Sequence, residues 1–177
     1  MKKLFLFTLS LIFLLALSAC GGTEQAASEP TPPANDPVSG ETVYNDFRLR
    51  LHADKSVYRT DEAIQIHATI EYIGEKETQN MEGGGSVLVF SVTDGADFNM
   101  DGLWLTELRR YGFKKGVEYV ADFVKSGGYD ANDPMADFWE EFYDQEELFL
   151  PPGTYTVSVS TTILDDFICS IEITVVE

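Results

Sequence analysis

The sequence predicts an all-β protein, an antiparallel β-sandwich of about seven short strands with a short acidic helical insert. Two observations lead to this prediction. From Val43 onwards, apolar and polar residues alternate over many short stretches, which is typical of strands with one buried face. Turn-forming Gly, Asp, Asn and Pro residues separate these stretches. Residues 133–147 have helical spacing instead and form the insert.

The predicted strands follow from the alternation. It is clearest in residues 47–53, 63–72, 155–163 and 167–176. Residues 87–92 are almost continuously apolar, which favours a central strand covered on both faces. Residues 103–108 and 117–124 are further strand candidates. Residues 74–86 are expected to form a polar loop.

The helical insert begins with Asp133, which suits an N-cap, and Pro134, which suits the first helical position. Large apolar side chains then recur at helical spacing: Met135, Phe138, Trp139 and Phe142. Acidic residues fill most of the other positions. The aromatic residues Phe138, Trp139 and Phe142 form either a ligand-binding surface or a cap over an open end of the sandwich.

The N-terminal segment has the composition of an export signal. Lys2 and Lys3 precede an apolar run, residues 4–17, that is shorter than the about 20 residues a bilayer span requires. The sequence Leu-Ser-Ala-Cys at 17–20 resembles the lipobox of bacterial lipoproteins. This resemblance implies cleavage after residue 19 and acylation of Cys20, with palmitate among the acyl chains. The alternatives are an uncleaved apolar anchor helix and an ordinary signal peptide with a chance Cys.

Composition divides the chain into a signal peptide (1–19), a tether (20–43) and one folded domain (44–177). The tether has four prolines and almost no large apolar residues, so it cannot bury enough surface to offset its ordering entropy. We therefore expect it to be disordered. The domain has the aromatic and β-branched residues that a core needs.

The charge of the chain is strongly negative. The signal removes Lys2 and Lys3 from the 12 basic residues and none of the 30 acidic ones, which leaves a net charge of −20. Such a surface repels nucleic acid and anionic lipid head groups. We therefore expect nucleic acid and anionic lipid surfaces to be poor partners, with no nucleic acid bound, and we expect a monomer.

The chain has two cysteines, Cys20 and Cys169. Acylation of Cys20 leaves Cys169 without a partner, so no intramolecular disulfide is expected. Cys169 alternates in sequence with Phe167 and Ile171, as on the buried face of a strand. We interpret it as a small apolar core residue rather than a reactive thiol.

One segment offers candidate metal ligands. Residues 97–102 match the D-x-[DN]-x-[DN]-G opening of a calcium loop, so Asp97, Asn99 and Asp101 are candidate calcium ligands. Position 12 of such a loop is Leu108 instead of a bidentate Glu. The alternative is an ordinary turn between strands. No other cofactor is expected.

No motif indicates an enzyme, and we expect no catalytic residues. The glycines at 83–85 lack the Lys of a phosphate-binding loop and precede a strand, so they are interpreted as a flexible turn. His52 and His67 lie on the polar sides of two predicted strands, without a zinc-binding motif. With two histidines, few general-base arrangements remain.

Two stretches resemble a known family. Lys55, Tyr58, Glu62 and Ile64 match the K-x-x-Y-x-x-x-E-x-I opening of bacterial immunoglobulin-like domains. Residues 150–155 match their L-P-P-G-x-Y entry to a late strand. Over residues 47–176 the chain is most similar to the intracellular proteinase inhibitor (BsuPI-like) type. The resemblance implies an immunoglobulin-like sandwich and protease inhibition through an exposed loop such as residues 74–85.

The expected function is that of a binding module for a protein or cell-envelope ligand, anchored in the cell membrane through lipid on Cys20, on the extracytoplasmic face. The alternatives are an inhibitor of extracellular proteases and a calcium-binding surface module.

Overall fold

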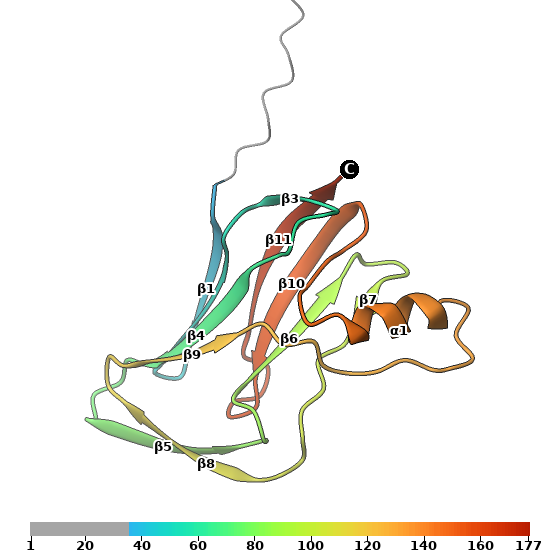
Figure 1. Cartoon of the computed structure of the whole chain (residues 1–177). Helices are drawn as coiled ribbons and strands as arrows, with labels where there is room; N and C mark the ends of the chain where they lie inside the picture. The colour runs from blue at the N-terminus through green and yellow to red at the C-terminus, as the bar shows by residue number, and fades with distance from the viewer. Residues whose placement is uncertain (1–35) are drawn as a thin grey trace, which may run out of the picture. The chain divides into compact units, whose positions relative to one another are not determined.

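The computed structural model describes residues 36–177, which fold as an all-β sandwich (Figure 1). The first sheet is antiparallel and has the strand order β1-β2-β4-β9. Its strands are β1 (Val38–Tyr44), β2 (Phe47–Ala53), β4 (Ile66–Tyr72) and β9 (Glu118–Asp122). The predicted fold class is confirmed.

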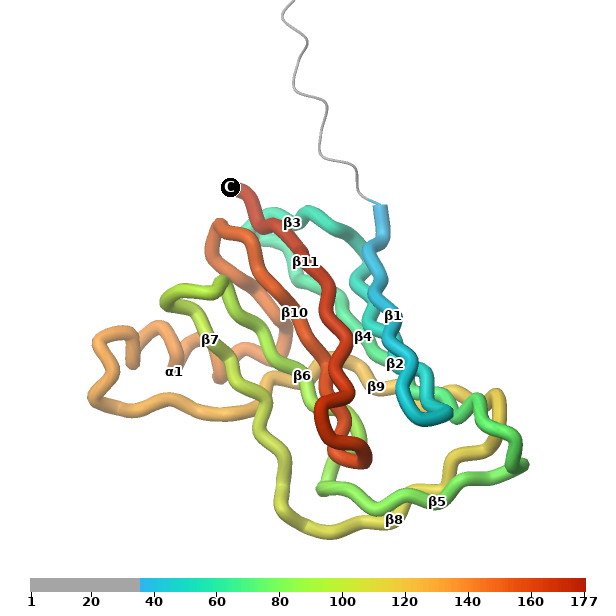
Figure 2. The backbone as a smooth tube through the Cα atoms, turned by 180° about the vertical axis from the view of Figure 1, so that it is seen from behind, coloured from blue at the N-terminus to red at the C-terminus, as the bar shows by residue number. Residues whose placement is uncertain are grey.

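The second sheet packs against the first and has the order β3-β11-β10-β6-β7 (Figure 2). Its strands are β3 (Val57–Arg59), β11 (Ile168–Val176), β10 (Gly153–Thr161), β6 (Leu88–Thr93) and β7 (Asn99–Met100). Only β3 and β11 run parallel among these pairs. The core lies between the two sheets, where the alternate residues that the sequence assigns to the apolar faces are buried, Cys169 among them.

Two strands leave the sandwich and form a separate antiparallel pair, which we call the arm. They are β5 (Thr78–Gly83) and β8 (Arg109–Lys114). The arm lies at the end of the sandwich opposite the C-terminus (Figures 1 and 2). The predicted polar loop at 74–86 is therefore wrong in part, because it contains β5. Phe113 of β8 is buried, and Met81 of β5 packs against the core.

The strand predicted at residues 103–108 is absent. The segment has no regular secondary structure, and β8 begins only at Arg109. The Leu105 carbonyl accepts a hydrogen bond from the Gly85 amide at 3.1 Å. The glycines at 83–85 are thus a packing site rather than a flexible turn: a Cβ on Gly85 would lie 3.0 Å from the Leu105 Cβ.

The folded part starts earlier than the predicted boundary at residue 44. β1 begins at Val38 and pairs with β2 over its whole length, from Val38 opposite Ala53 to Tyr44 opposite Phe47. Few large apolar residues mark this strand, because it packs through small ones. A Cβ on Gly40 would lie 2.8 Å from the Ser170 carbonyl oxygen of β11.

The signal, Cys20 and most of the predicted tether lie outside the described residues. Within residues 36–177, no helix is long and apolar enough to span a bilayer.

The motifs that carry the family resemblance form local hydrogen bonds and an ion pair. The Tyr58 hydroxyl donates to the Asp54 carboxylate at 2.6 Å, and the Lys55 ammonium pairs with the Glu62 carboxylate. Burial and this hydrogen bond raise the pKa of Tyr58. The Tyr155 hydroxyl donates to the Pro151 carbonyl at 2.9 Å, so residues 150–155 fix the entry to β10. Both motifs support the framework of the sandwich.

Candidate functional site

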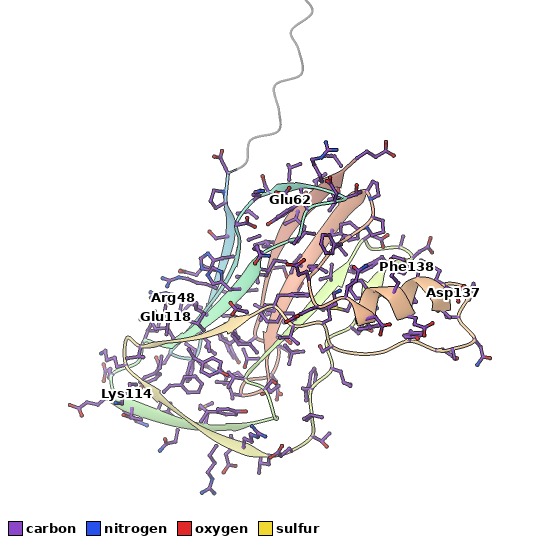
Figure 3. All side chains as sticks on the ribbon, in the orientation of Figure 1. Arg48, Glu62, Lys114, Glu118, Asp137 and Phe138 are labelled. Atoms are coloured by element: carbon purple, nitrogen blue, oxygen red, sulfur yellow. The ribbon has the colours of Figure 1, made fainter. Side chains whose placement is uncertain are left out.

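The helix α1 (Ala136–Asp144) carries the aromatic residues predicted as a ligand surface. It begins three residues after Asp133, whose carboxylate accepts a hydrogen bond from the Met135 amide at 2.7 Å. Trp139 and Phe142 are buried, whereas Phe138, which Figure 3 labels on α1, is half-buried.

These aromatic side chains pack around Phe98. The Phe98 ring centroid lies 5.0 Å from that of Trp139, 5.6 Å from that of Phe142 and 5.4 Å from that of Tyr155. This packing makes α1 a cap over one end of the sandwich. Phe138 and the largely buried Phe142 also line an open hollow, of about 240 Å³, beside Pro151. A ligand role for Phe138 stays a prediction.

Lys125 fixes the C-terminal end of α1. Its ammonium donates hydrogen bonds to the carbonyls of Phe142 at 2.6 Å and Gln145 at 2.8 Å, and it lies 4.4 Å from the Phe142 ring centroid. Burial lowers the pKa of Lys125. A cation at a helix C-terminus satisfies carbonyls that have no partner within the helix. No sequence pattern indicates this contact, because Lys125 lies 17 residues from Phe142.

Replacing Lys125 with Met keeps the apolar stem but removes both hydrogen bonds. We expect Lys125→Met to lower the free energy of unfolding by about 1.5–3 kcal/mol, the range for hydrogen bonds made by a charged group. Thermal unfolding followed by tryptophan fluorescence measures this change. The exposed Lys115→Met is the matched control and should change stability by less than about 0.5 kcal/mol. Equal effects of the two substitutions would contradict the capping role.

The candidate calcium ligands lie in and beside β7: Asp97 is on the turn before it, Asn99 is its first residue and Asp101 follows it. Asp97, Asn99 and Asp101 are exposed, while Phe98 and Met100 between them are buried. Alternate residues of an extended chain are about 6.6–6.8 Å apart, so the backbone positions of Asn99 and Asp101 are well separated. In residues 36–177, no three His, Cys, Asp or Glu side chains are placed to hold a metal ion. Calcium binding stays a prediction.

The structure brings the two histidines together. His52 of β2 and His67 of β4 are register partners, and their rings stack with centroids 4.9 Å apart. On the other side of His67, its partner in the register of β4 and β9 is Asp122. Burial, followed by the neighbouring charge of His67, lowers the pKa of His52. The two residues are 15 positions apart in sequence, so only the strand register reveals the pair.

This lowered pKa predicts that acid destabilises the fold. The folded state favours neutral His52, so the unfolded chain binds more protons as pH falls below the ordinary value of 6.5. The contribution of His52 to stability is therefore present above that pH and is lost below it. Lowering the pH below 6.5 should therefore lower the melting temperature of the wild type, and it should lower that of His52→Gln by less. The control Arg59→Gln, on the distant β3, should show the same fall in melting temperature as the wild type. Equal pH dependence of the wild type and His52→Gln would contradict the prediction.

A network of ion pairs covers the rest of the outer face of the first sheet. Arg48 pairs with Glu71 at 2.9 Å, and Arg50 pairs with both Glu41 and Glu118 at 2.8 Å. Figure 3 labels Arg48 and Glu118 on this face. Because each Arg and Glu in this network already has an ion-pair partner, this region is poorly suited to bind a further charged ligand.

Exposed apolar side chains gather on another part of the surface. Of the 14 large apolar residues that are exposed in residues 36–177, eight lie between Leu103 and Val124. They are Leu103, Trp104, Leu105, Leu108, Val117, Tyr119, Val120 and Val124. The sequence predicted strands in both halves of this stretch, but an apolar pattern does not show which residues face the core. Exposed apolar patches of this kind mark interaction sites.

Part of this surface is a groove beside β9. Leu103, Tyr119 and Val124 line a hollow of about 180 Å³, together with the buried Val89 and Phe90. We call it the β9 groove. β9 is the last strand of the first sheet, and its other edge has no strand partner in the described part of the chain.

The backbone of β9 offers unpaired groups along this edge. The Phe123 amide donates to the carbonyl of Ile66, the first residue of β4. Phe123, Ala121 and Tyr119 therefore direct their backbone groups towards β4. The intervening residues Val120 and Asp122 direct theirs away from the sheet.

Comparison with models of known protein families found no match, and comparison with curated proteins found none either.

Proposed function

We propose that this chain is a lipid-anchored, extracytoplasmic binding module that takes an extended peptide segment of a partner protein along β9. The observation that carries the proposal is the concentration of exposed apolar side chains between Leu103 and Val124, beside an open sheet edge. The anchor in this proposal is acylated Cys20, supported by the lipobox resemblance at residues 17–20.

Strand addition explains how the edge would be used. A peptide strand beside β9 pairs with the outward backbone groups of Val120 and Asp122, and places alternate side chains in the β9 groove. The backbone pairing supplies affinity, and the groove selects apolar side chains. The acidic residues at the two ends of β9, Glu118 and Asp122, favour a partner segment with Lys or Arg residues.

Protease inhibition remains the alternative function. Much of the loop that the resemblance implies for protease contact, residues 74–85, is paired in the arm as β5, so we place binding at β9. Incubation with a panel of proteases distinguishes the two functions, because only an inhibitor lowers their activity stoichiometrically.

Two exposed valines on opposite edges of the first sheet test the binding surface. Val120 of β9 is 57% exposed and Val43 of β1 is 52% exposed. We expect Val120→Glu to abolish capture of a partner from envelope extract, and Val43→Glu to retain it. Hydrogen exchange should show slower exchange of the β9 amides when the captured partner is bound. Loss of capture in both variants, or unchanged exchange in β9, would place the binding surface elsewhere.

The anchor has its own test. Cys20→Ser should release the protein from the membrane fraction, because acylation requires the thiol and two acyl chains are needed for stable anchoring. If the variant stays with the membranes, the apolar run at 4–17 is a retained helix and the lipid anchor is wrong.

A further inference from the structure

Positive charge is concentrated in one short segment of this acidic chain. Residues 103–117 contain four Lys or Arg residues and a single acidic one, Glu107. Glu107 is paired with Arg109 at 3.0 Å. Among the ion pairs of residues 36–177, none includes Lys114 or Lys115. The paired stretch of the arm, residues 74–83, adds one Lys and three Glu residues. The two stretches together carry five basic and four acidic side chains, so this end is close to neutral with a small positive excess, unlike the strongly negative chain as a whole.

Three large apolar side chains stand next to these charges. Trp104, Leu105 and Leu108 are 52%, 66% and 71% exposed, and we call them the apolar ridge. Such exposure would be costly if the residues had no apolar partner. The β9 groove uses the neighbouring Leu103 but none of these three.

The ridge is held in place rather than loosely attached. The Leu105 carbonyl accepts a hydrogen bond from the Gly85 amide at 3.1 Å, and the Leu103 amide donates to the Ser126 hydroxyl at 3.2 Å. A Cβ on Gly84 would lie 3.3 Å from the Trp104 ring, so the indole rests directly on this glycine. The chain thus presents these side chains to solvent on a fixed support.

The charged side chains of the arm extend the same end of the sandwich. Along β8, Phe113 faces the core, so the alternate residues Arg110 and Lys114 face outwards. The Arg110 side chain is 85% exposed although it pairs with Glu82. Figure 3 shows Lys114 at the outer end of the arm. An apolar ridge therefore continues into a basic strand at one end of the domain.

We infer that the apolar ridge and the outer face of β8 bind an anionic lipid surface. Trp and Leu side chains partition into the interface of a bilayer, while Lys and Arg attract acidic head groups. The acidic remainder of the domain opposes this contact weakly, because salt screens charges more distant than about 8 Å. A protein partner would explain the exposed ridge, but not the excess of basic residues beside it in so acidic a chain.

The proposed anchor is compatible with this contact. From Cys20 to Val38 the chain reaches up to about 60 Å when extended. The nine residues of β10 span about 30 Å, which approximates the length of the sandwich. A lipid on Cys20 therefore allows the arm end to meet the bilayer. The contact itself does not require the anchor or the partner proposed above.

The test uses residues 21–177, a chain that has no acylation site and retains every described strand, the helix and the core. It is mixed with vesicles of phosphatidylcholine alone or of phosphatidylcholine with phosphatidylglycerol. We expect co-sedimentation with the anionic vesicles only, weakened by salt. Trp139 is only 7% exposed, so a blue shift of tryptophan emission on binding reports Trp104.

Matched variants identify the surface. Leu105→Asp should lower the partition coefficient by more than about ten-fold. Lys114→Gln should lower it by about five-fold, the effect of one basic residue at an acidic surface. The controls Val176→Asp and Arg59→Gln make the same charge changes on two register partners at the opposite end of the sandwich, and should leave it unchanged.

Four outcomes would overturn the inference: no vesicle binding, equal binding to both vesicle types, no shift of tryptophan emission, or equal effects of the ridge variants and their controls. Capture of a protein through Leu105 without vesicle binding would also overturn it and assign the ridge to a protein partner. Val120→Glu should still bind vesicles, so failure here is distinct from failure of the β9 proposal.

Discussion

Phe98→Ala is expected to lower the free energy of unfolding by about 3–5 kcal/mol, the range for truncating a buried aromatic side chain. Phe98 is 4% exposed, and its ring packs on those of Trp139, Phe142 and Tyr155. Its removal leaves a cavity between α1 and the sandwich. Trp139 lies beside that cavity. The emission of Trp139 in the folded variant should therefore lie at longer wavelength than in the folded wild type.

The neighbouring aspartate is the matched control. Asp97 is exposed, so Asp97→Ala should change stability by less than about 0.5 kcal/mol. Chemical denaturation of both variants measures the difference. If Asp97→Ala were as destabilising as Phe98→Ala, the segment would depend on its carboxylates, and a bound ion would become the better explanation.

The contrast between these residues shows how one pattern allowed two interpretations. The spacing of Asp97, Asn99 and Asp101 matches a calcium loop, and the same spacing places Phe98 and Met100 on the opposite side of the chain. The structure buries the second set. A sequence motif of alternating residues does not state which side is used, because that depends on what packs against it.

Alternation predicted the strands that have one fully buried face. In β2, for example, every second residue from Phe47 to Ala53 is buried, as expected. It failed for residues 103–108, where an equally apolar stretch lies on the surface. Alternation also failed to predict β5, whose residues are mostly polar. The arm buries one side of this strand, and that side only partly, so few apolar residues are needed there. The pair of His52 and His67 depends on register, which local sequence does not specify.

The N-terminal boundary was misplaced for a related reason. Composition detects a folded segment through large apolar residues, and β1 has few because it packs closely through Gly40 against β11. β1 contributes backbone pairing with β2, and its Gly40 packs over the Cys169 side chain. Neither is visible in a count of residue types.

A chain that starts at Tyr44 should therefore be much less stable than one that starts at Asp36. Without β1, the edge of β2 loses its partner strand and the inner side of β11 is uncovered. We expect a loss of about 3 kcal/mol or more, a large fraction of the 5–15 kcal/mol typical of a folded domain. Chemical denaturation of the two chains measures this loss.

Cys169 gives a second measurement of the same change. It is 2% exposed, burial raises its pKa, and a Cβ on Gly40 would lie 3.0 Å from its sulfur. A thiol reagent should modify it slowly in the chain that starts at Asp36 and rapidly in the shorter one. Gly40→Val keeps the full length but forces β1 away from β11, so it should also increase the rate. Equal stability and equal thiol reactivity of the two chains would show that β1 adds nothing and that the domain begins at residue 44.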